Sequence, residues 1–220
     1  MLPITVVIPA LNAADTLAAT LAALGRVAEV LVIDGGSCDR TPQLARQLGC
    51  RVLTAPRGRG MQLAAGVAAA RCDWLLLLHA DTSLQAGWTG AASRHMQRFP
   101  DRAGYFRFAL DSADRRARRL ERAVAWRCCL LALPYGDQGL LIHRSLLARV
   151  GGMRPLPLME DVDLVRRLGR RQLTALDATA LTSAAKWQHD GWRRRSARNL
   201  LCLGLWFAGL PPDRLVRLYG

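Results

Sequence analysis

Short hydrophobic runs alternate with amphipathic segments over roughly the first eighty residues. The runs lie at residues 4–8, 29–33, 51–53 and 75–78. Each has the length of a buried strand, and the segments between them carry apolar residues at helical spacing, for example Leu17, Leu21 and Leu24. Alternating strands and helices predict an α/β protein with a doubly wound, mostly parallel mixed sheet.

Start and stop signals support the helices of this region. Asn12 precedes the first amphipathic segment and Gly25 follows it, so we expect Asn12 to cap this helix and Gly25 to end it. Thr41 followed by Pro42 predicts the start of a second helix with Thr41 as its cap, and Gly49 predicts its end.

The pattern is looser after residue 81, but it still predicts regular elements. We expect strands at 104–110 and 138–143, helices at 115–133 and 160–171, and helix from 193 to the end. No linker or repeat interrupts the chain, so a single domain over 1–220 is the simplest organisation. Within it we distinguish a nucleotide-binding half at about 1–83, an acceptor and catalytic half at about 84–175, and a helical basic segment at about 176–220.

Composition narrows the class of protein. The chain has 220 residues, is 51% hydrophobic and carries a formal net charge of +14, almost all of it from arginine, with Lys186 as the single lysine. Arginine suits bidentate binding of phosphate, so a phosphorylated small molecule, nucleic acid and an anionic membrane all fit this charge. The basic helix at 115–122 leaves peripheral contact with anionic lipid open.

Cysteine usage and hydropathy predict a cytoplasmic location, with the inner face of the membrane left open. The six cysteines show no metal-ligand spacing, which is typical of free thiols in a reducing compartment. No basic segment precedes the first strand, so we expect no signal peptide. The longest apolar run, 200–210, is half the length that spans a bilayer.

Polar residues concentrate in four loops. Three follow or precede the predicted strands of the first half, at 34–37, 56–60 and 79–81, and the fourth is at 159–163. Ligands of parallel sheets bind outside the carboxyl ends of the strands, where His79 and Asp81 would lie on the same side of the chain. Arg57 and Arg59 precede a helix N-terminus, which favours an anion such as phosphate.

Four strings in these regions resemble the ordered signatures of family 2 glycosyltransferases with the GT-A fold. They are ITVVIPALN at 4–12, VIDGGS at 32–37, LHAD at 78–81 and ED at 160–161. The strings RGRG at 57–60, YGDQ at 135–138 and LMED at 158–161 further resemble a bacterial subgroup labelled radical-SAM/selenodomain-associated or arsenosugar-biosynthesis glycosyltransferase. The resemblance implies a three-layer αβα fold and an inverting hexosyltransferase-type enzyme.

The resemblance also implies a role for each matching residue. Asp161 would be the general base, and Asp81 would hold Mg²⁺ or Mn²⁺ against the donor diphosphate, with His79 and His189 as further candidate ligands. The donor site would comprise Pro9, Ala10, Asn12, Asp34, Gly35, Arg57, Arg59, Gly60, Ala80 and Asp81. The acceptor site would comprise Gly136, Asp137, Gln138 and Glu160. Many relatives carry two acids at 34–35, so a UDP and a GDP donor both stay open.

The acceptor is predicted only as a hydroxyl, on a small metabolite, a lipid or carotenoid, or a glycan. A sugar-phosphate nucleotidyltransferase is a second enzyme class, but its Gly- and Arg-rich loop usually follows the first strand, where this chain has 9–12. A non-enzymatic module that binds nucleic acid or membrane would explain the charge. It would leave the strand-end carboxylates without a role, and we therefore expect no nucleic acid partner.

Overall fold

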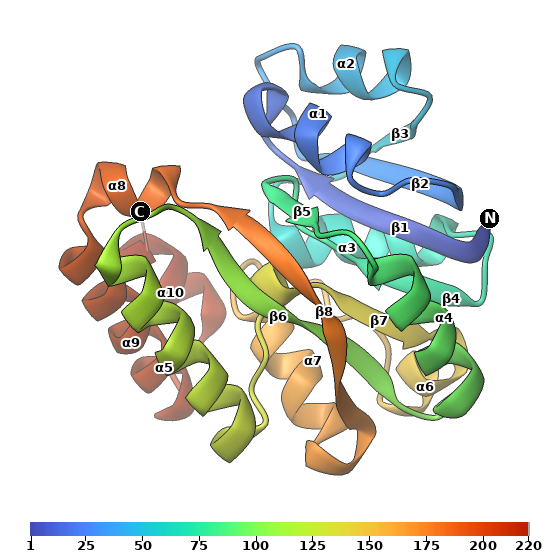
Figure 1. Ribbon diagram of the computed structural model, residues 1–220. Helices are drawn as coiled ribbons and strands as arrows, with labels where there is room; N and C mark the ends of the chain where they lie inside the picture. Colours follow the sequence, from blue (N-terminus) through green and yellow to red (C-terminus); the bar gives the residue numbers. More distant parts are fainter. Residues whose placement is uncertain (220) are drawn as a thin grey trace.

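The computed structural model describes residues 1–219, with the side chains of 217 and 219 left aside. A single eight-stranded mixed sheet runs through the molecule in the order β3-β2-β1-β4-β7-β6-β8-β5 (Figure 1). The strands are β1 (Leu2–Ala10), β2 (Val27–Asp34), β3 (Arg51–Thr54), β4 (Trp74–Leu77), β5 (Thr82–Leu84), β6 (Ala103–Asp111), β7 (Leu140–His143) and β8 (Leu173–Ser183). The first four are parallel, as their alternation with helices predicts.

Helices cover both faces of the sheet and give two separate hydrophobic cores. The helices are α1 (Ala14–Ala22), α2 (Thr41–Gln47), α3 (Arg59–Ala69), α4 (Trp88–Arg98), α5 (Arg115–Leu131), α6 (Arg144–Arg149), α7 (Glu160–Leu168), α8 (Ala185–Asp190), α9 (Trp192–Phe207) and α10 (Pro212–Tyr219). Val6 packs with α1, α2 and α4 on one face, whereas Val7 packs with α3, α6 and α7 on the other. Adjacent residues of a strand point to opposite faces, so the predicted αβα layering holds.

The second half of the sheet departs from the expected order of elements. β7 pairs antiparallel with both β4 and β6, and β8 pairs parallel with β6 and antiparallel with the short edge strand β5. We expected helical structure from residue 176, but residues 173–183 form the longest strand. Leu176, Ala178, Ala180 and Thr182 are buried at every second position. This alternation of buried and exposed positions is hard to recognise in the sequence, because alanine and threonine occupy most of the buried positions in place of large apolar residues.

Two predicted helix caps are wrong. Asn12 has a left-handed backbone, with φ 49°, and its Oδ1 accepts a hydrogen bond from the backbone of Cys38 at 2.8 Å. Thr41 is the first residue of α2 rather than its cap, and its hydroxyl accepts from the backbone N–H of Ala13 at 2.8 Å. Both side chains therefore join the loop after β1 to the loop after β2, which fixes the edge of the sheet where the parallel strands end.

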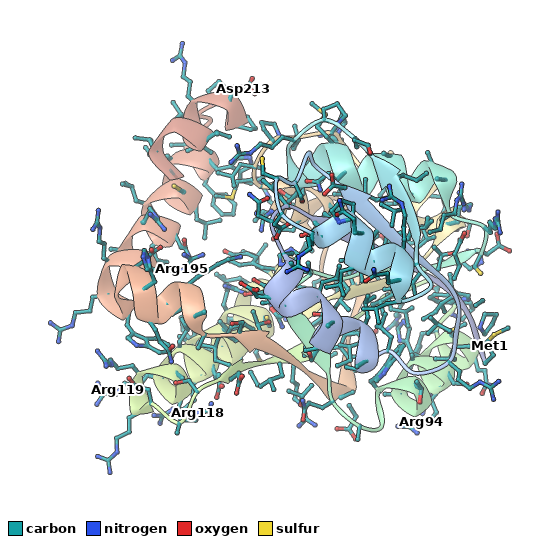
Figure 2. All side chains as sticks on the ribbon, turned by 90° about the horizontal axis from the view of Figure 1, so that it is seen from above. Met1, Arg94, Arg118, Arg119, Arg195 and Asp213 are labelled. Atoms are coloured by element: carbon teal, nitrogen blue, oxygen red, sulfur yellow. The ribbon has the colours of Figure 1, made fainter. Side chains whose placement is uncertain are left out.

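The C-terminal helices stand at one side of the sheet, next to α5 (Figure 2). They are held by a small apolar cluster in which Cys202 and Leu215 pack on Leu158, Met159 and Val162, around the start of α7. The predicted helix at 160–171 ends earlier, at Leu168, and a short 3-10 helix, η2 (Arg170–Gln172), follows. Among the described residues, no helix combines the length and apolarity needed to cross a bilayer.

Candidate active site

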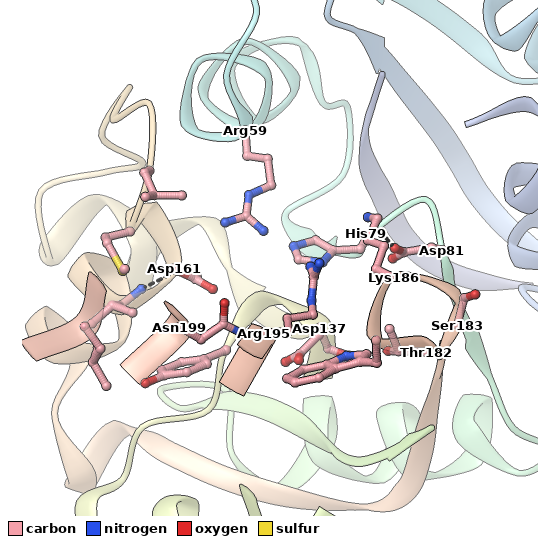
Figure 3. A pocket seen from close by; sticks show the side chains of 16 residues that line it. Arg59, His79, Asp81, Asp137, Asp161, Thr182, Ser183, Lys186, Arg195 and Asn199 are labelled. Carbon is pink, nitrogen blue, oxygen red and sulfur yellow. Dashed lines mark hydrogen bonds and ion pairs between the residues drawn. The ribbon is translucent and has the colours of Figure 1, made fainter. Parts of the chain in front are cut away.

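A cavity of about 140 Å³ opens at the ends of β4 and β8, between α3, α7 and the C-terminal helices (Figure 3). Charged side chains from five separate parts of the chain line it, namely Arg59, Asp81, Asp137, Asp161, Lys186 and Arg195. Apolar and aromatic side chains, among them Tyr135, Met159 and Trp187, form the rest of the wall. The cavity therefore brings together carboxylates and cations that are far apart in sequence.

Asp81 reaches the cavity from the connection between β4 and β5. This connection is fixed on both sides, because Thr20 donates a hydrogen bond to the Ala80 carbonyl at 3.0 Å and the backbone N–H of Ser183 donates to the Asp81 carbonyl at 3.0 Å. The Asp81 Oδ2 lies 2.9 Å from Lys186 Nζ. Burial works to raise the pKa of Asp81, but Lys186 and the neighbouring His79 outweigh it and lower that pKa. Asp81 is therefore ionised at neutral pH.

Asp161 lies in the first turn of α7, where its carboxylate is held by backbone N–H groups. Its Oδ2 accepts from Gly136 at 2.8 Å and its Oδ1 accepts from Val162 at 2.8 Å. Burial works to raise the pKa of Asp161, but Arg59 and the Gly136 hydrogen bond outweigh it, so the pKa is lowered. Each oxygen keeps a lone pair, so this charged carboxylate can still accept a proton.

Gly136 belongs to a 3-10 turn, η1 (Gly136–Gln138), that touches both His79 and Asp161. A Cβ at this position would lie 2.5 Å from His79 Nε2 and 3.3 Å from Asp161 Oδ2. Any other residue here would force the imidazole aside. His79 itself is neutral at pH 7, because burial and the nearby Arg59 lower its pKa to about 4.

Arg59 is the first residue of α3 and pairs with Glu160, the first residue of α7. The two side chains are 2.9 Å apart, and Glu160 is fully buried. Burial raises the pKa of Glu160 to about 7, although Arg59 works in the opposite direction. Gly60 permits this approach, since a Cβ there would lie 2.2 Å from the Leu156 carbonyl oxygen. The loop at 56–60, which the sequence predicts to bind an anion, thus lies against Glu160 and the residues before it.

Three polar atoms at the cavity wall are buried and have no hydrogen-bond partner among the described residues. They are the hydroxyl of Tyr135, Oδ1 of Asp137 and Oδ1 of Asn199. Burial raises the pKa of Asp137 to about 6, with Asp161 and Asp81 adding to the shift and Arg127 opposing it. Buried polar groups are nearly always hydrogen-bonded in native proteins, so these atoms are ready to bind polar groups of a ligand.

Several predicted donor residues lie at the same edge of the sheet but outside the cavity wall. Asp34 Oδ2 accepts from the backbone N–H groups of Gly36 and Ser37, both at 3.1 Å, and so shapes its own turn. Gly35 donates its N–H to the Ala10 carbonyl at 2.9 Å. The other predicted donor residues that do not line the cavity are Pro9, Ala10, Asn12, Arg57, Gly60 and Ala80.

Two predicted site residues point elsewhere. Gln138 is buried, with its Nε2 donating to the Phe106 carbonyl at 3.0 Å and its Oε1 accepting from Tyr135 N–H at 3.2 Å, so its side chain stabilises the turn. The side chain of His189 is 89% exposed and lies 3.0 Å from Asp190, away from the cavity.

Sequence reasoning did not identify several uncharged wall residues at the end of β8 and in the C-terminal helices. Trp187, Asn199 and Leu203 line the cavity from α8 and α9, and Thr182 and Ser183 do so from the end of β8. The Arg195 guanidinium lies 5.4 Å above the Trp187 ring and forms an ion pair with Asp190 at 2.7 Å. The pattern from 193 to the end does predict helix with arginines on one side, but it does not show which uncharged residues of that helix face the cavity.

Comparison with known proteins identifies the family. Residues 5–156 match the family described as Glycosyl transferase family 2, so the chain belongs to that family. Over 85 residues it is 40% identical to uncharacterized glycosyltransferases of Mycobacterium tuberculosis and Mycobacterium bovis. Each match covers 38% of this chain and 39% of the relative, so it spans about two fifths of the relative's length.

Solved structures share the fold. Glucosyl-3-phosphoglycerate synthase from Mycobacterium tuberculosis, in complex with Mn²⁺ and UDP-glucose, has a TM-score of 0.56 at 22% identity, covering 82% of this chain and 69% of that chain. TarS from S. aureus has a TM-score of 0.66 at 13% identity, covering 100% of this chain and 69% of that chain. The predicted GT-A-like fold and the family 2 resemblance are thus confirmed.

Proposed function

We propose that the protein is an inverting glycosyltransferase that moves a sugar from a UDP- or GDP-sugar to an acceptor hydroxyl. One observation carries the proposal: the ionised carboxylate of Asp161 shares a small cavity with Asp81 and with arginine and lysine side chains. Such transfer needs a base for the incoming hydroxyl and positive charge for the departing diphosphate. The cavity holds both within one space.

Asp161 would take the proton from the acceptor hydroxyl as the oxygen attacks the anomeric carbon. The attack comes from the face opposite the leaving diphosphate, which inverts the configuration at that carbon. The lowered pKa keeps Asp161 in the charged form that can accept the proton. Lys186, which is paired with Asp81, and Arg195, elsewhere on the same wall, would stabilise the charge that develops on the diphosphate.

Mg²⁺ or Mn²⁺ fits beside Asp81. Structures of glucosyl-3-phosphoglycerate synthase were solved with Mn²⁺ or Mg²⁺ together with UDP. Here the Asp81 carboxylate and the neutral His79 imidazole could hold such an ion, whereas the described residues contain no group of three metal-binding side chains. The bound ion would act as a Lewis acid that neutralises charge on the diphosphate. Most of its ligands would therefore come from the donor.

The remaining donor residues would form the nucleotide side of the site, next to the cavity. Asp34 and the loops at 9–12 and 35–38 lie at the ends of β1 and β2, where they would meet the base and ribose. The acceptor would bind against Asp137 of η1, whereas the fully buried Glu160 is paired with Arg59 and would support the site from behind the cavity wall. The unpartnered atoms of Tyr135, Asp137 and Asn199 support an acceptor that carries several polar groups. The strings at 57–60, 135–138 and 158–161 support membership of the radical-SAM/selenodomain-associated or arsenosugar-biosynthesis subgroup.

A binding screen tests the proposal. UDP-, GDP- and dTDP-sugars, each with and without Mn²⁺, are added to the protein and its melting temperature is measured, because a ligand of the folded state stabilises it by mass action. We expect a UDP- or GDP-sugar to raise the melting temperature and Asp81→Ala to reduce the Mn²⁺-dependent part of the rise. A shift with duplex DNA and none with any nucleotide would favour the nucleic-acid-binding alternative.

We further propose that the cytoplasmic enzyme contacts an anionic membrane through the outer faces of α5 and α9. Trp126 and Leu200 are 64% and 68% exposed on these helices, and both helices begin with exposed arginines. Arg166 lies 5.0 Å from the Phe207 ring at the end of α9, and Arg170 donates to the Cys129 carbonyl near the end of α5 at 2.9 Å. Exposed apolar side chains among arginines complement a negatively charged bilayer.

Vesicle sedimentation tests this contact. We expect the protein to sediment with vesicles of mixed phosphatidylglycerol and phosphatidylcholine and to be released from them by high salt. It should not sediment with vesicles of pure phosphatidylcholine. The double change Trp126→Ser and Leu200→Ser should abolish sedimentation. The matched control is Leu48→Ser, which removes an apolar side chain that is 49% exposed directly after α2. Equal sedimentation of both variants would contradict the proposal.

A further inference from the structure

The positive charge next to the Asp81 carboxylate comes from a side chain of the protein itself. Lys186 Nζ lies 2.9 Å from Asp81 Oδ2, and Lys186 is the single lysine of the sequence. The residue two positions before Asp81 is a histidine, so this element offers one carboxylate instead of two. An ammonium group therefore stands against the carboxylate that a divalent ion would need.

The backbone places Lys186 at this point. Thr82 pairs with Thr182 between β5 and β8, their hydroxyl oxygens lie 3.0 Å apart, and the N–H of Ser183 donates to the Asp81 carbonyl. α8 begins two residues later, at Ala185, so Lys186 lies in its first turn. The pairing of the two strands thus fixes the backbone of Lys186 beside Asp81. The Lys186 side chain is 65% exposed and has room to move.

The other cations of the cavity have carboxylate partners outside the donor position. Arg59 forms an ion pair with Glu160, and Arg195 forms one with Asp190 at 2.7 Å. Lys186, in contrast, is paired with Asp81 at the position proposed for the diphosphate. A bound diphosphate would add negative charge next to Asp81, and the ammonium group, with three donors, can bridge the carboxylate and a phosphate oxygen.

We propose that Lys186 is a built-in counter-cation for the donor diphosphate, and that it lets the cavity bind a nucleoside diphosphate without a divalent ion. The same contact makes Lys186 a competitor of the metal for Asp81. The inference rests on the proposed function. It adds that metal strengthens donor binding here but is not required for it.

Calorimetric titration with UDP and GDP tests the inference, in EDTA and in Mn²⁺, on the wild type, Lys186→Met, Lys186→Arg and the control Arg193→Met. Arg193 is exposed and is not part of the cavity wall. We expect the wild type to bind one nucleotide in EDTA. Lys186→Met should weaken that binding on the order of tenfold or more, the size of one hydrogen bond to a charged group. Lys186→Arg should retain most of it, and Arg193→Met should match the wild type.

Mn²⁺ binding gives a second measurement. With UDP present, electron paramagnetic resonance should show tighter Mn²⁺ binding to Lys186→Met than to the wild type, because Asp81 has lost its competing ammonium group. Unchanged nucleotide binding by Lys186→Met in EDTA would overturn the inference, as would a wild type that binds nucleotide only with Mn²⁺. Both results leave the proposed function intact. If neither nucleotide binds under either condition, the proposed function itself fails.

Discussion

Two groups of carboxylates among the predicted site residues differ in where their partners come from. Asp34 accepts hydrogen bonds from residues two and three positions further on, within its own turn. Asp81 and Asp161 have partners from distant parts of the chain, Lys186 and Gly136. The first arrangement shapes a loop and is complete without a ligand. The second assembles charge around a cavity, which makes it the place where we expect chemistry.

The largest effect is expected from the second group. Asp161→Asn removes the proposed base but keeps the shape of the side chain, so the sugar-transfer rate should fall about 10²- to 10⁴-fold, the contribution of a positioned general base. Donor affinity measured by calorimetry should change little, because Asp161 would act on the acceptor. An activity within a few-fold of the wild type would remove Asp161 from the role of base.

Stability separates the two groups more directly than activity. Asp34→Ala removes the buried, charged acceptor of the Gly36 and Ser37 N–H groups, so the free energy of unfolding should fall by about 1–3 kcal/mol, the contribution of hydrogen bonds to a charged group. Asp81→Ala, the matched carboxylate of the cavity, loses an ion pair to an exposed lysine and should change it by less than about 1 kcal/mol. Chemical denaturation measures both. A larger loss of stability from Asp81→Ala than from Asp34→Ala would contradict the assignment of Asp34 to the structure of its loop and of Asp81 to ligand binding.

A smaller effect concerns pH. The pKa of buried Glu160 is raised to about 7 from an ordinary 4.5, so the folded protein binds this proton more tightly than the unfolded chain. The resulting stabilisation is complete below about pH 4.5 and is lost as pH rises through 7. Glu160→Gln, which cannot titrate, should remove a decrease on the order of 2 kcal/mol between pH 5 and 8. Denaturation at several pH values would contradict this if both proteins gave the same slope.

The same contrast explains how far the sequence could be interpreted. Local signals, such as the apolar run at 75–78 and the glycines after Asp34, predicted the parallel strands and the loops at their ends, because such elements depend mainly on residues that are neighbours in sequence. β8 was missed because its buried positions carry small residues. The wall residues Trp187, Asn199 and Leu203 were missed because their position arises from packing between segments about a hundred residues apart, which periodicity does not record.

The smallest effect is expected from a change at His189. This change tests whether the position of a side chain in the structure is a better guide to metal binding than its residue type. Histidine is a common metal ligand, which made His189 a candidate. Its side chain is 89% exposed and pairs with Asp190 outside the cavity. His189→Ala should therefore leave Mn²⁺ affinity in the presence of UDP within twofold of the wild type, as measured by electron paramagnetic resonance. A large loss of Mn²⁺ affinity would mean that α8 turns inward when donor binds, and that the cavity as described lacks one of its walls.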